Sequence, residues 1–164
     1  MFALACQPSA KQEATVGTGL VNPYYSRTDT TILNVPDSIW KSVLSDSVFQ
    51  VARNKATERA FTGKYYKYNS RGTYYCAVCG NRLFRSDAKF ASDCGWPSFF
   101  EPSRPTSVRY EPDTSHGLNR IEVLCGRCDS HLGHVFDDGP PPTGKRFCMN
   151  SIILDFVPEL GSSQ

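Results

Sequence analysis

Residues 76–79 read CAVC and residues 125–128 read CGRC, and these two pairs determine the fold that we predict. Each C-x-x-C pair can present two thiolates to one ion, and two pairs complete a tetrahedral four-sulfur site. One structural zinc ion is expected there, and iron is compatible with the same geometry. A bound ion would connect segments that lie 45 residues apart, so it would supply part of the folding free energy. The four predicted ligands are Cys76, Cys79, Cys125 and Cys128.

Disulfides and redox chemistry are the alternatives for these two pairs. A disulfide within one C-x-x-C pair closes a very short loop and therefore stabilises little. The chain also has seven cysteines, an odd number. A thioredoxin-like redox pair is expected once, next to a β-α-β pattern, and the sequence shows no such pattern. A structural metal site therefore fits the sequence better than either alternative.

Length and composition indicate a single soluble domain. The chain has 164 residues, 40% of them hydrophobic, which is enough to bury a core. No stretch approaches the roughly 18 apolar residues that a membrane-spanning helix requires. The net charge is +2 and no run of Lys and Arg forms a basic stripe, which argues against nucleic acid as a partner. A monomer is the default expectation.

The N-terminal region resembles part of a targeting signal. Residues 1–6 read MFALAC, like the end of a lipoprotein signal, with Cys6 as the residue that would carry lipid. A working signal needs a basic region and about 7–15 apolar residues, which this stretch lacks. We therefore predict a cytoplasmic protein; an envelope lipoprotein or periplasmic protein is the alternative if the true start lies upstream of Met1. Residues 1–35 are predicted to be a leader or linker, because residues 7–35 are polar and aperiodic.

The remaining sequence predicts a mainly β fold with a short helical arm at its N-terminus. Pro36, Asp37 and Ser38 provide an N-cap before apolar residues at helical spacing, and Ser45 can cap a second short helix. From Phe61 onward, short aromatic and β-branched segments alternate with turn residues. This pattern is typical of a compact antiparallel β domain.

The heptapeptide KRFCMNS contains Cys148, which has no other cysteine nearby in the sequence. In a strand, alternate residues share a face, so the phenylalanine and methionine of this stretch should face one side. Arg146, Cys148 and Asn150 should face the other, as in the wall of a site. The cation favours the thiolate, which is the reactive species. An inert buried cysteine is equally compatible with this heptapeptide alone.

Several longer motifs make the chain similar to a known family. They are TERAFTGKYY, CAVCGNRLF, CGWPSFF, SHGLNRIEVLCGRCDSHLGHVFDDGPPPTG and RFCMNS, in this order. In these motifs the chain resembles the methionine-R-sulfoxide reductases, the MsrB family. The resemblance covers residues 36–158, which we predict to be the catalytic domain, and leaves residues 159–164 as a C-terminal tail. It implies the zinc-containing β fold of that family and the reduction of methionine-R-sulfoxide in oxidised proteins or peptides.

The resemblance implies a role for each of two unpaired cysteines. Cys148 matches the family's nucleophile, which attacks the sulfoxide sulfur and becomes a sulfenic acid. Cys94 matches the resolving cysteine, which forms a disulfide with Cys148 and releases water. Thioredoxin would then reduce this disulfide by exchange. The family commonly has glycine where this chain has Asp93, and a carboxylate there is expected to disfavour the Cys94 thiolate.

The resemblance also assigns residues to acid catalysis and substrate binding. Because the sulfoxide oxygen leaves readily only when protonated, the site needs an acid that titrates near neutral pH. By resemblance His134 is this acid, assisted by Asn150 and by His131, which is grouped with the substrate-binding residues. Trp96 is expected to pack against the substrate methyl group. Arg146 is placed at the substrate site, where it should mainly tune the thiolate.

Two questions stay open at the level of sequence. Residues three apart face opposite sides of a regular strand, so His131 and His134 can both reach the site only if the strand bends or bulges. Asp138 could orient one of them, and an additional metal site or a plain surface position is the alternative for the pair. A non-catalytic zinc-containing β binding module on the same scaffold is the alternative for the whole chain. The presence of both Cys148 and Cys94 favours the enzyme.

Overall fold

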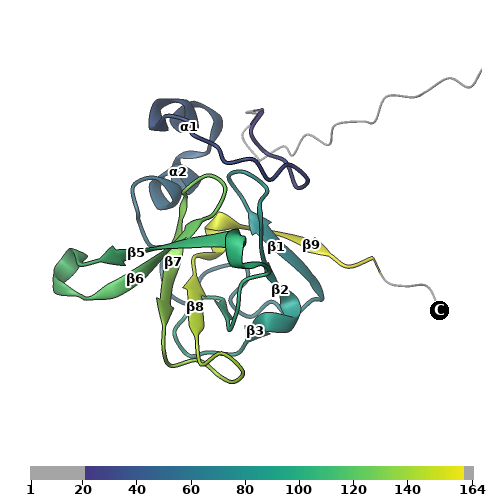
Figure 1. Ribbon diagram of the computed structural model, residues 1–164, viewed down its shortest axis with the longest axis vertical. Coiled ribbons are helices and arrows are strands. Elements are labelled where there is room, and N and C mark those ends of the chain that lie inside the picture. Colours follow the sequence, from purple (N-terminus) through teal and green to yellow (C-terminus); the bar gives the residue numbers. More distant parts are fainter. Residues whose placement is uncertain (1–20, 161–164) are drawn as a thin grey trace, which may run out of the picture.

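Two antiparallel β-sheets make up most of the computed structural model, which describes residues 21–160 (Figure 1). The smaller sheet has the strand order β2-β1-β9, and the larger has the order β3-β4-β8-β7-β6-β5. The strands are β1 (Gly72–Cys76), β2 (Arg82–Arg85), β3 (Lys89–Phe90), β4 (Ser98–Phe99), β5 (Val108–Asp113), β6 (Arg120–Cys125), β7 (His131–Phe136), β8 (Arg146–Met149) and β9 (Leu154–Pro158). The predicted mainly β fold with a short helical arm is therefore confirmed.

Aromatic side chains form the core where the two sheets meet. The ring of Tyr74 in β1 lies edge-on to Phe99 in β4, with 5.0 Å between ring centroids. Phe84 of β2 stacks on Phe99 with a centroid separation of 4.4 Å. All three side chains are fully buried, and burial of each of the two phenylalanines stabilises the fold by about 1.5–3 kcal/mol. This cluster holds the small sheet against β4, the neighbour of the strand that carries Cys148.

The helical arm comprises α1 (Asp37–Val43) and α2 (Asp46–Ala52). Ser45 caps α2 as predicted, because its hydroxyl accepts a hydrogen bond from Val48 N at 3.4 Å. The predicted side-chain cap of α1 is wrong, since Pro36 occupies the N-cap position and offers no side-chain acceptor. Asp37 lies in the first turn instead, where its carboxylate pairs with Arg53 at 2.6 Å.

Residues 21–35, the segment before the helices, are held in place by hydrogen bonds and an ion pair from one buried arginine. This arginine lies between the two cysteines of the second C-x-x-C pair. Arg127 is only 3% exposed. Its guanidinium donates hydrogen bonds to the main-chain oxygens of Tyr24 and Thr31, both at 3.1 Å, and pairs with the Asp29 carboxylate at 2.9 Å. A buried guanidinium is stable only when its donors find such acceptors.

Main-chain hydrogen bonds attach the same segment to both C-x-x-C turns. Ser26 N donates to the carbonyl oxygen of Cys79 at 3.0 Å, and Leu33 N donates to that of Arg127 at 2.7 Å. The guanidinium of Arg127 also donates to the Cys79 carbonyl, so the two turns share this contact. Part of the predicted leader thus packs on the segments that carry the four paired cysteines.

Residues 1–20 and 161–164 lie outside the described part of the chain. The interpretation of Cys6 as a lipid attachment point falls there and stays a prediction. Within residues 21–160, no helix combines the length and the apolar character needed to cross a membrane.

Replacing Arg127 with Ala should lower the free energy of unfolding by about 2–4 kcal/mol, because buried carbonyl acceptors lose a charged donor. Urea denaturation measures this loss. Arg109→Ala is the matched control, since Arg109 is half-exposed and pairs with Glu111 and Asp129 at the surface, where a loss below about 1 kcal/mol is expected. Equal losses for the two variants would show that the buried arginine does not fasten residues 21–35.

Candidate active site and four-cysteine centre

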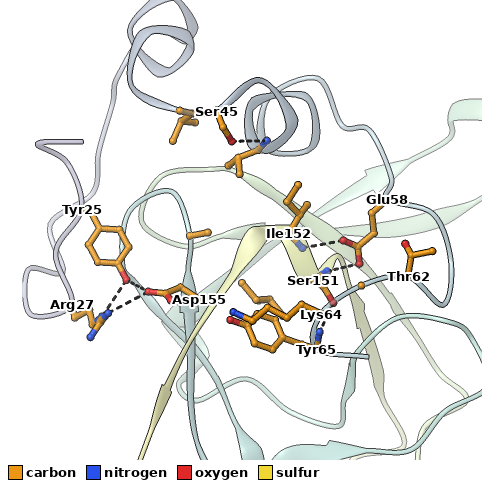
Figure 2. A pocket seen from close by; sticks show the side chains of 15 residues that line it. Tyr25, Arg27, Ser45, Glu58, Thr62, Lys64, Tyr65, Ser151, Ile152 and Asp155 are labelled. Atoms are coloured by element: carbon orange, nitrogen blue, oxygen red, sulfur yellow. Dashed lines mark hydrogen bonds and ion pairs between the residues drawn. The ribbon is translucent and has the colours of Figure 1, made fainter. Parts of the chain in front are cut away.

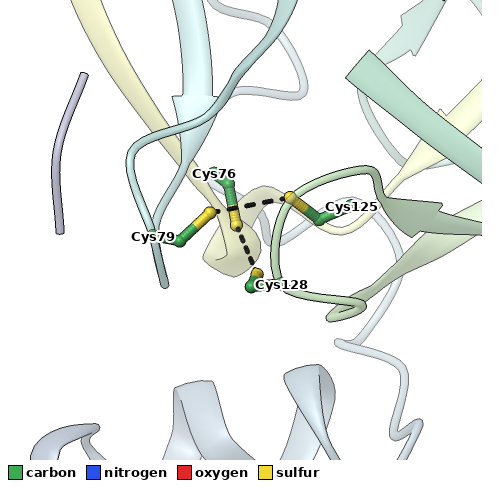
Figure 3. A group of neighbouring side chains, drawn as sticks. All are labelled: Cys76, Cys79, Cys125 and Cys128. Atoms are coloured by element: carbon green, nitrogen blue, oxygen red, sulfur yellow. Dashed lines mark hydrogen bonds between the residues drawn. The ribbon is translucent and has the colours of Figure 1, made fainter. Parts of the chain in front are cut away.

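The four cysteines of the two C-x-x-C motifs come together at one point between the two sheets (Figure 3). All are buried, and their sulfur atoms lie within 4.8 Å of one another. The Cys76 and Cys128 sulfurs are 3.8 Å apart, and those of Cys79 and Cys125 are 3.6 Å apart. Each of these contacts joins one C-x-x-C pair to the other, as a shared ion requires.

The spacing of these sulfurs fits a tetrahedral metal ion. Zinc–sulfur bonds of about 2.3 Å place neighbouring sulfurs of a tetrahedron about 3.8 Å apart. Polar groups also surround the cluster: the Asn81 side-chain amide donates to the Cys125 sulfur at 3.5 Å, and Ser130 Oγ lies 3.2 Å from the Cys128 sulfur. Such outer contacts orient metal ligands. The predicted four-sulfur site is therefore present and can hold a metal ion.

Cys94 and Cys148, the other two cysteines among residues 21–160, meet at the larger sheet. Cys148 lies in β8, where its register partners are His134 in β7 and Ser98 in β4. Directly opposed residues on neighbouring strands share a face of the sheet, so the thiol and the imidazole lie side by side. The close approach depends on Gly133, because a Cβ there would lie 2.0 Å from the carbonyl oxygen of Cys148.

The sulfur atoms of Cys94 and Cys148 are 3.3 Å apart. Their hydrogen bond lowers the pKa of Cys94 to about 4, against the effect of burial, with help from the hydroxyls of Ser92 and Ser98. The same hydrogen bond, together with burial, raises the pKa of Cys148. The pair therefore loses its first proton easily and its second with difficulty. These hydrogen bonds favour the Cys94 thiolate, and the opposing effect expected from Asp93 stays a prediction.

Arg146 lies beside this pair but outside the cavity. Its guanidinium forms a bidentate ion pair with the Asp138 carboxylate, at 2.8 and 2.9 Å. The guanidinium carbon also lies over the Phe136 ring, 4.5 Å from the ring centroid. It counteracts the rise in the pKa of Cys148. This agrees with thiolate tuning and not with direct substrate contact. Because the Asp138 carboxylate pairs with Arg146 and forms no hydrogen bond to either histidine, the prediction that it orients one of them is wrong.

Asp113 is the residue that orients His134. Its Oδ2 atom lies 2.7 Å from His134 Nε2, and Arg120 donates to the same oxygen at 2.8 Å. Hydrogen bonds from Ser115 and from His134 hold the pKa of Asp113 well below its usual range. The carboxylate thus stays ionised and fixes the ring, which leaves only Nδ1 of His134 free for proton transfer.

His131 lies behind His134 and not in the cavity. The pairing of β6 with β7 shifts register between Val123 and Leu124. The strand pair is therefore irregular, as was required for His131 and His134 to lie near each other, and the centroids of their rings are 5.5 Å apart. Yet His131 is only 2% exposed, and its Nδ1 atom lies 2.7 Å from the buried carboxylate of Glu122. Burial lowers the pKa of His131. Its ring packs against that of His134 and does not line the cavity.

A cavity of about 110 Å³ opens above Cys148. Trp96 and Asn150 line it as predicted, and the indole nitrogen of Trp96 donates to the carbonyl oxygen of Glu58 at 3.1 Å. The complete lining is Thr57, Trp96, Arg120, Gly133, His134, Phe136, Cys148, Met149 and Asn150. The cavity is large enough for a side-chain tip but not for a peptide, so a peptide would lie across its mouth.

Sequence reasoning missed Thr57, Arg120 and Asp113. Thr57 and Arg120 fall within the motifs TERAFTGKYY and SHGLNRIEV, but nothing in their own spacing marks them. Asp113 lies outside every motif, in β5. Its approach to His134 depends on the pairing of β5 with β6 and of β6 with β7, which the sequence does not specify.

Comparison with known proteins gives a consistent family. The family described as SelR domain matches residues 44–158. The chain is 53% identical over 120 residues to "Peptide methionine sulfoxide reductase MsrB" of Azotobacter vinelandii, covering 73% of this chain and 90% of that protein. It is 54% identical over 120 residues to the protein of the same name from Methanosarcina barkeri, covering 73% and 84%. For that of Pseudomonas paraeruginosa the identity is 50% over 129 residues, covering 79% and 98%.

The matched region contains both cysteine centres and every residue that lines the cavity. The chain therefore belongs to the MsrB family of methionine-R-sulfoxide reductases, which are oxidoreductases. The non-catalytic binding module on the same scaffold is not favoured.

The hydrogen bond between the two sulfurs predicts opposite pH shifts in two single variants. Cys148→Ala removes the main cause of the low pKa of Cys94, so alkylation of Cys94 by iodoacetamide should move from acidic pH toward the ordinary thiol range near 8.5. Cys94→Ala removes the main cause of the raised pKa of Cys148, so Cys148 should ionise more easily. Peptide mass spectrometry of alkylation rates between about pH 4 and 10 measures both shifts. Profiles that match the wild-type protein would contradict the coupling.

Proposed function

We propose that this chain reduces methionine-R-sulfoxide in proteins and peptides, with Cys148 as the nucleophile and Cys94 as the resolving cysteine. Membership of the MsrB family supports the reaction. The observation that carries the residue roles is the 3.3 Å separation of the two sulfurs beside His134 in a small cavity.

In the first step, the sulfur pair carries one proton; when this proton lies on Cys94, the Cys148 sulfur is the thiolate and attacks the sulfoxide sulfur. The bond formed between the two sulfurs and the sulfur–oxygen bond of the substrate then both break as the oxygen passes to Cys148 and takes up a proton, so methionine is released and Cys148 becomes a sulfenic acid. His134 donates the proton that the departing oxygen requires, and Asp113 fixes the ring while it does so. Trp96 supplies an apolar face for the substrate methyl group.

Asn150 supplies a hydrogen-bond donor in this proposal. Its Oδ1 atom accepts from Glu58 N at 3.0 Å, and its Nδ2 atom donates to the carbonyl oxygen of Leu132 at 3.0 Å. A carboxamide has two N–H groups, so one remains for the sulfoxide oxygen. The other two contacts fix the direction of that donor.

In the second step, the Cys94 thiolate attacks the Cys148 sulfenic acid, forms a disulfide and releases water. Sulfurs at 3.3 Å need only a small displacement to reach the disulfide bond length of about 2.05 Å. A protein dithiol such as thioredoxin then reduces the disulfide by exchange and is itself oxidised.

Replacing Cys94 with Ser should separate the two steps. The first step uses only Cys148, so the variant should release about one equivalent of methionine per enzyme in a single turnover. Dithiothreitol should sustain further cycles by reducing the stranded sulfenic acid, whereas thioredoxin should not do so efficiently. Methionine released per enzyme, with each reductant in turn, gives the result. Cys148→Ser is the control and should release none, and undiminished thioredoxin-driven turnover by Cys94→Ser would contradict the resolving role.

We further propose that the four-cysteine centre holds one zinc ion with a purely structural role. The ion would link the turn after β1 to the turn after β6, and no step of the reaction would pass through it. The buried thiols and their tetrahedral spacing support this assignment.

Cys76→Ser should release the metal and unfold the chain, because comparable sites contribute about 10–16 kcal/mol of apparent binding free energy. Metal content by atomic emission and far-UV circular dichroism measure these two effects. The matched control is Cys148→Ser, which should keep both metal and fold. A folded, metal-free Cys76→Ser protein would show that the centre is not structural.

A further inference from the structure

Glu58, within the motif TERAFTGKYY, forms more hydrogen bonds to the active-site segment than any role assigned above explains. Its carboxylate accepts from Ser151 N at 2.6 Å and from Ile152 N at 3.0 Å. These two N–H groups begin the short 3-10 helix η4 (Ser151–Ile153), which follows directly after Asn150. The first N–H groups of a helix have no partner within it, so the carboxylate satisfies donors that would otherwise be unpaired.

The main chain of Glu58 contacts two residues that line the cavity. Its carbonyl oxygen accepts from the Trp96 indole nitrogen at 3.1 Å, and its N–H group donates to Asn150 Oδ1 at 3.0 Å. Trp96 belongs to the loop after Cys94, whereas Asn150 follows Cys148. One residue therefore forms a hydrogen bond with a side chain from each of the two segments that carry the reacting cysteines.

The side chain of Glu58 lies on the far side of this wall, in a second cavity of about 670 Å³ (Figure 2). Figure 2 shows its carboxylate directed at Ser151 and Ile152, away from the cluster of Tyr25, Arg27 and Asp155 at the other end of that cavity. Glu58 is not among the residues that line the cavity above Cys148. It therefore acts on a substrate only through other residues.

The carboxylate is closely packed on the side that faces Gly63 and Ser151. A Cβ on Gly63 would lie 2.5 Å from Glu58 Oε1 and 2.4 Å from Ser151 Oγ. That hydroxyl in turn accepts a hydrogen bond from Tyr65 N at 3.1 Å. The loop from Glu58 to Tyr65 is thus fastened to the start of η4 at two points, and a carboxylate in this position has little freedom to move.

From these contacts, and given the proposed function, we infer that Glu58 is a positioning residue that sets the distance between Trp96 and the Asn150 amide. Trp96 is assigned to the substrate methyl group and Asn150 to the sulfoxide oxygen. The relative placement of methyl and oxygen is what distinguishes the two epimers of the sulfoxide. Glu58 should therefore control both the rate of the first step and the preference for the R epimer.

Glu58→Gln and Glu58→Ala test this inference as a graded pair. A carboxamide has one oxygen in place of two, so Gln should lose one of the two bonds to η4, and Ala should lose both. We expect Ala to slow single-turnover methionine release by roughly 10–100-fold, since small misplacements at an active site have effects of that size. The ratio of kcat/KM for the R epimer over the S epimer should fall at least roughly tenfold, with Gln intermediate in both measurements.

Three controls separate positioning from general damage. Glu101→Gln changes an exposed carboxylate and should leave rate and selectivity unchanged. The alkylation rates of Cys94 and Cys148 and the far-UV circular dichroism of the Glu58 variants should match the wild-type protein, because neither sulfur contacts Glu58. If Glu58→Ala fails to fold, Glu58→Gln carries the test.

The outcomes are distinguishable from failure of the proposed function. If wild-type protein prefers the R epimer and both Glu58 variants keep its rate and selectivity, Glu58 is not a positioning residue. If the alkylation rates or the far-UV circular dichroism signal of the Glu58 variants change in proportion to their loss of activity, the role of Glu58 is structural and the inference is overturned. If wild-type protein consumes both epimers equally, the proposed function itself fails.

Discussion

The four-sulfur cluster is the constraint on which the arrangement of the active site depends. It joins the turn after β1, in the small sheet, to the turn that connects β6 with β7 in the large sheet. The second turn determines where β7 begins, and β7 presents His134 opposite Cys148 in β8. Arg127 lies within the same turn and binds residues 21–35 over the centre, so the N-terminal segment adds to this constraint.

Strand pairing then assembles the chemistry from residues far apart in sequence. Cys148, His134 and Ser98 lie side by side in three neighbouring strands, and Cys94 reaches the same point from the loop before β4. A carboxylate contacts each of the two histidines: the partly buried Asp113 contacts His134, and the fully buried Glu122 contacts His131. Each orients a neighbour without entering the cavity, and Glu58 does the same from the opposite wall.

The sequence predicted those features that depend on local spacing. The two C-x-x-C pairs predicted the four-sulfur site, and alternation along residues 146–149 predicted a buried face for Phe147 and Met149 and a partly exposed one for Cys148. The partner of His134 could not be predicted, because Asp113 reaches it only through the pairing of three strands. The same applies to the burial of His131, which results from how β7 packs and not from its own motif.

The central claim is that Cys94 and Cys148 react with each other during turnover because the fold holds their sulfurs in contact. The most direct measurement is peptide mapping by mass spectrometry after wild-type protein has turned over methionine-R-sulfoxide once without any reductant. We expect a single new species, in which the peptide that contains Cys94 is joined by a disulfide to the peptide that contains Cys148, in an amount equal to the methionine released. A disulfide that involves Cys6 or one of the four clustered cysteines, or a sulfenic acid that persists on Cys148, would contradict it.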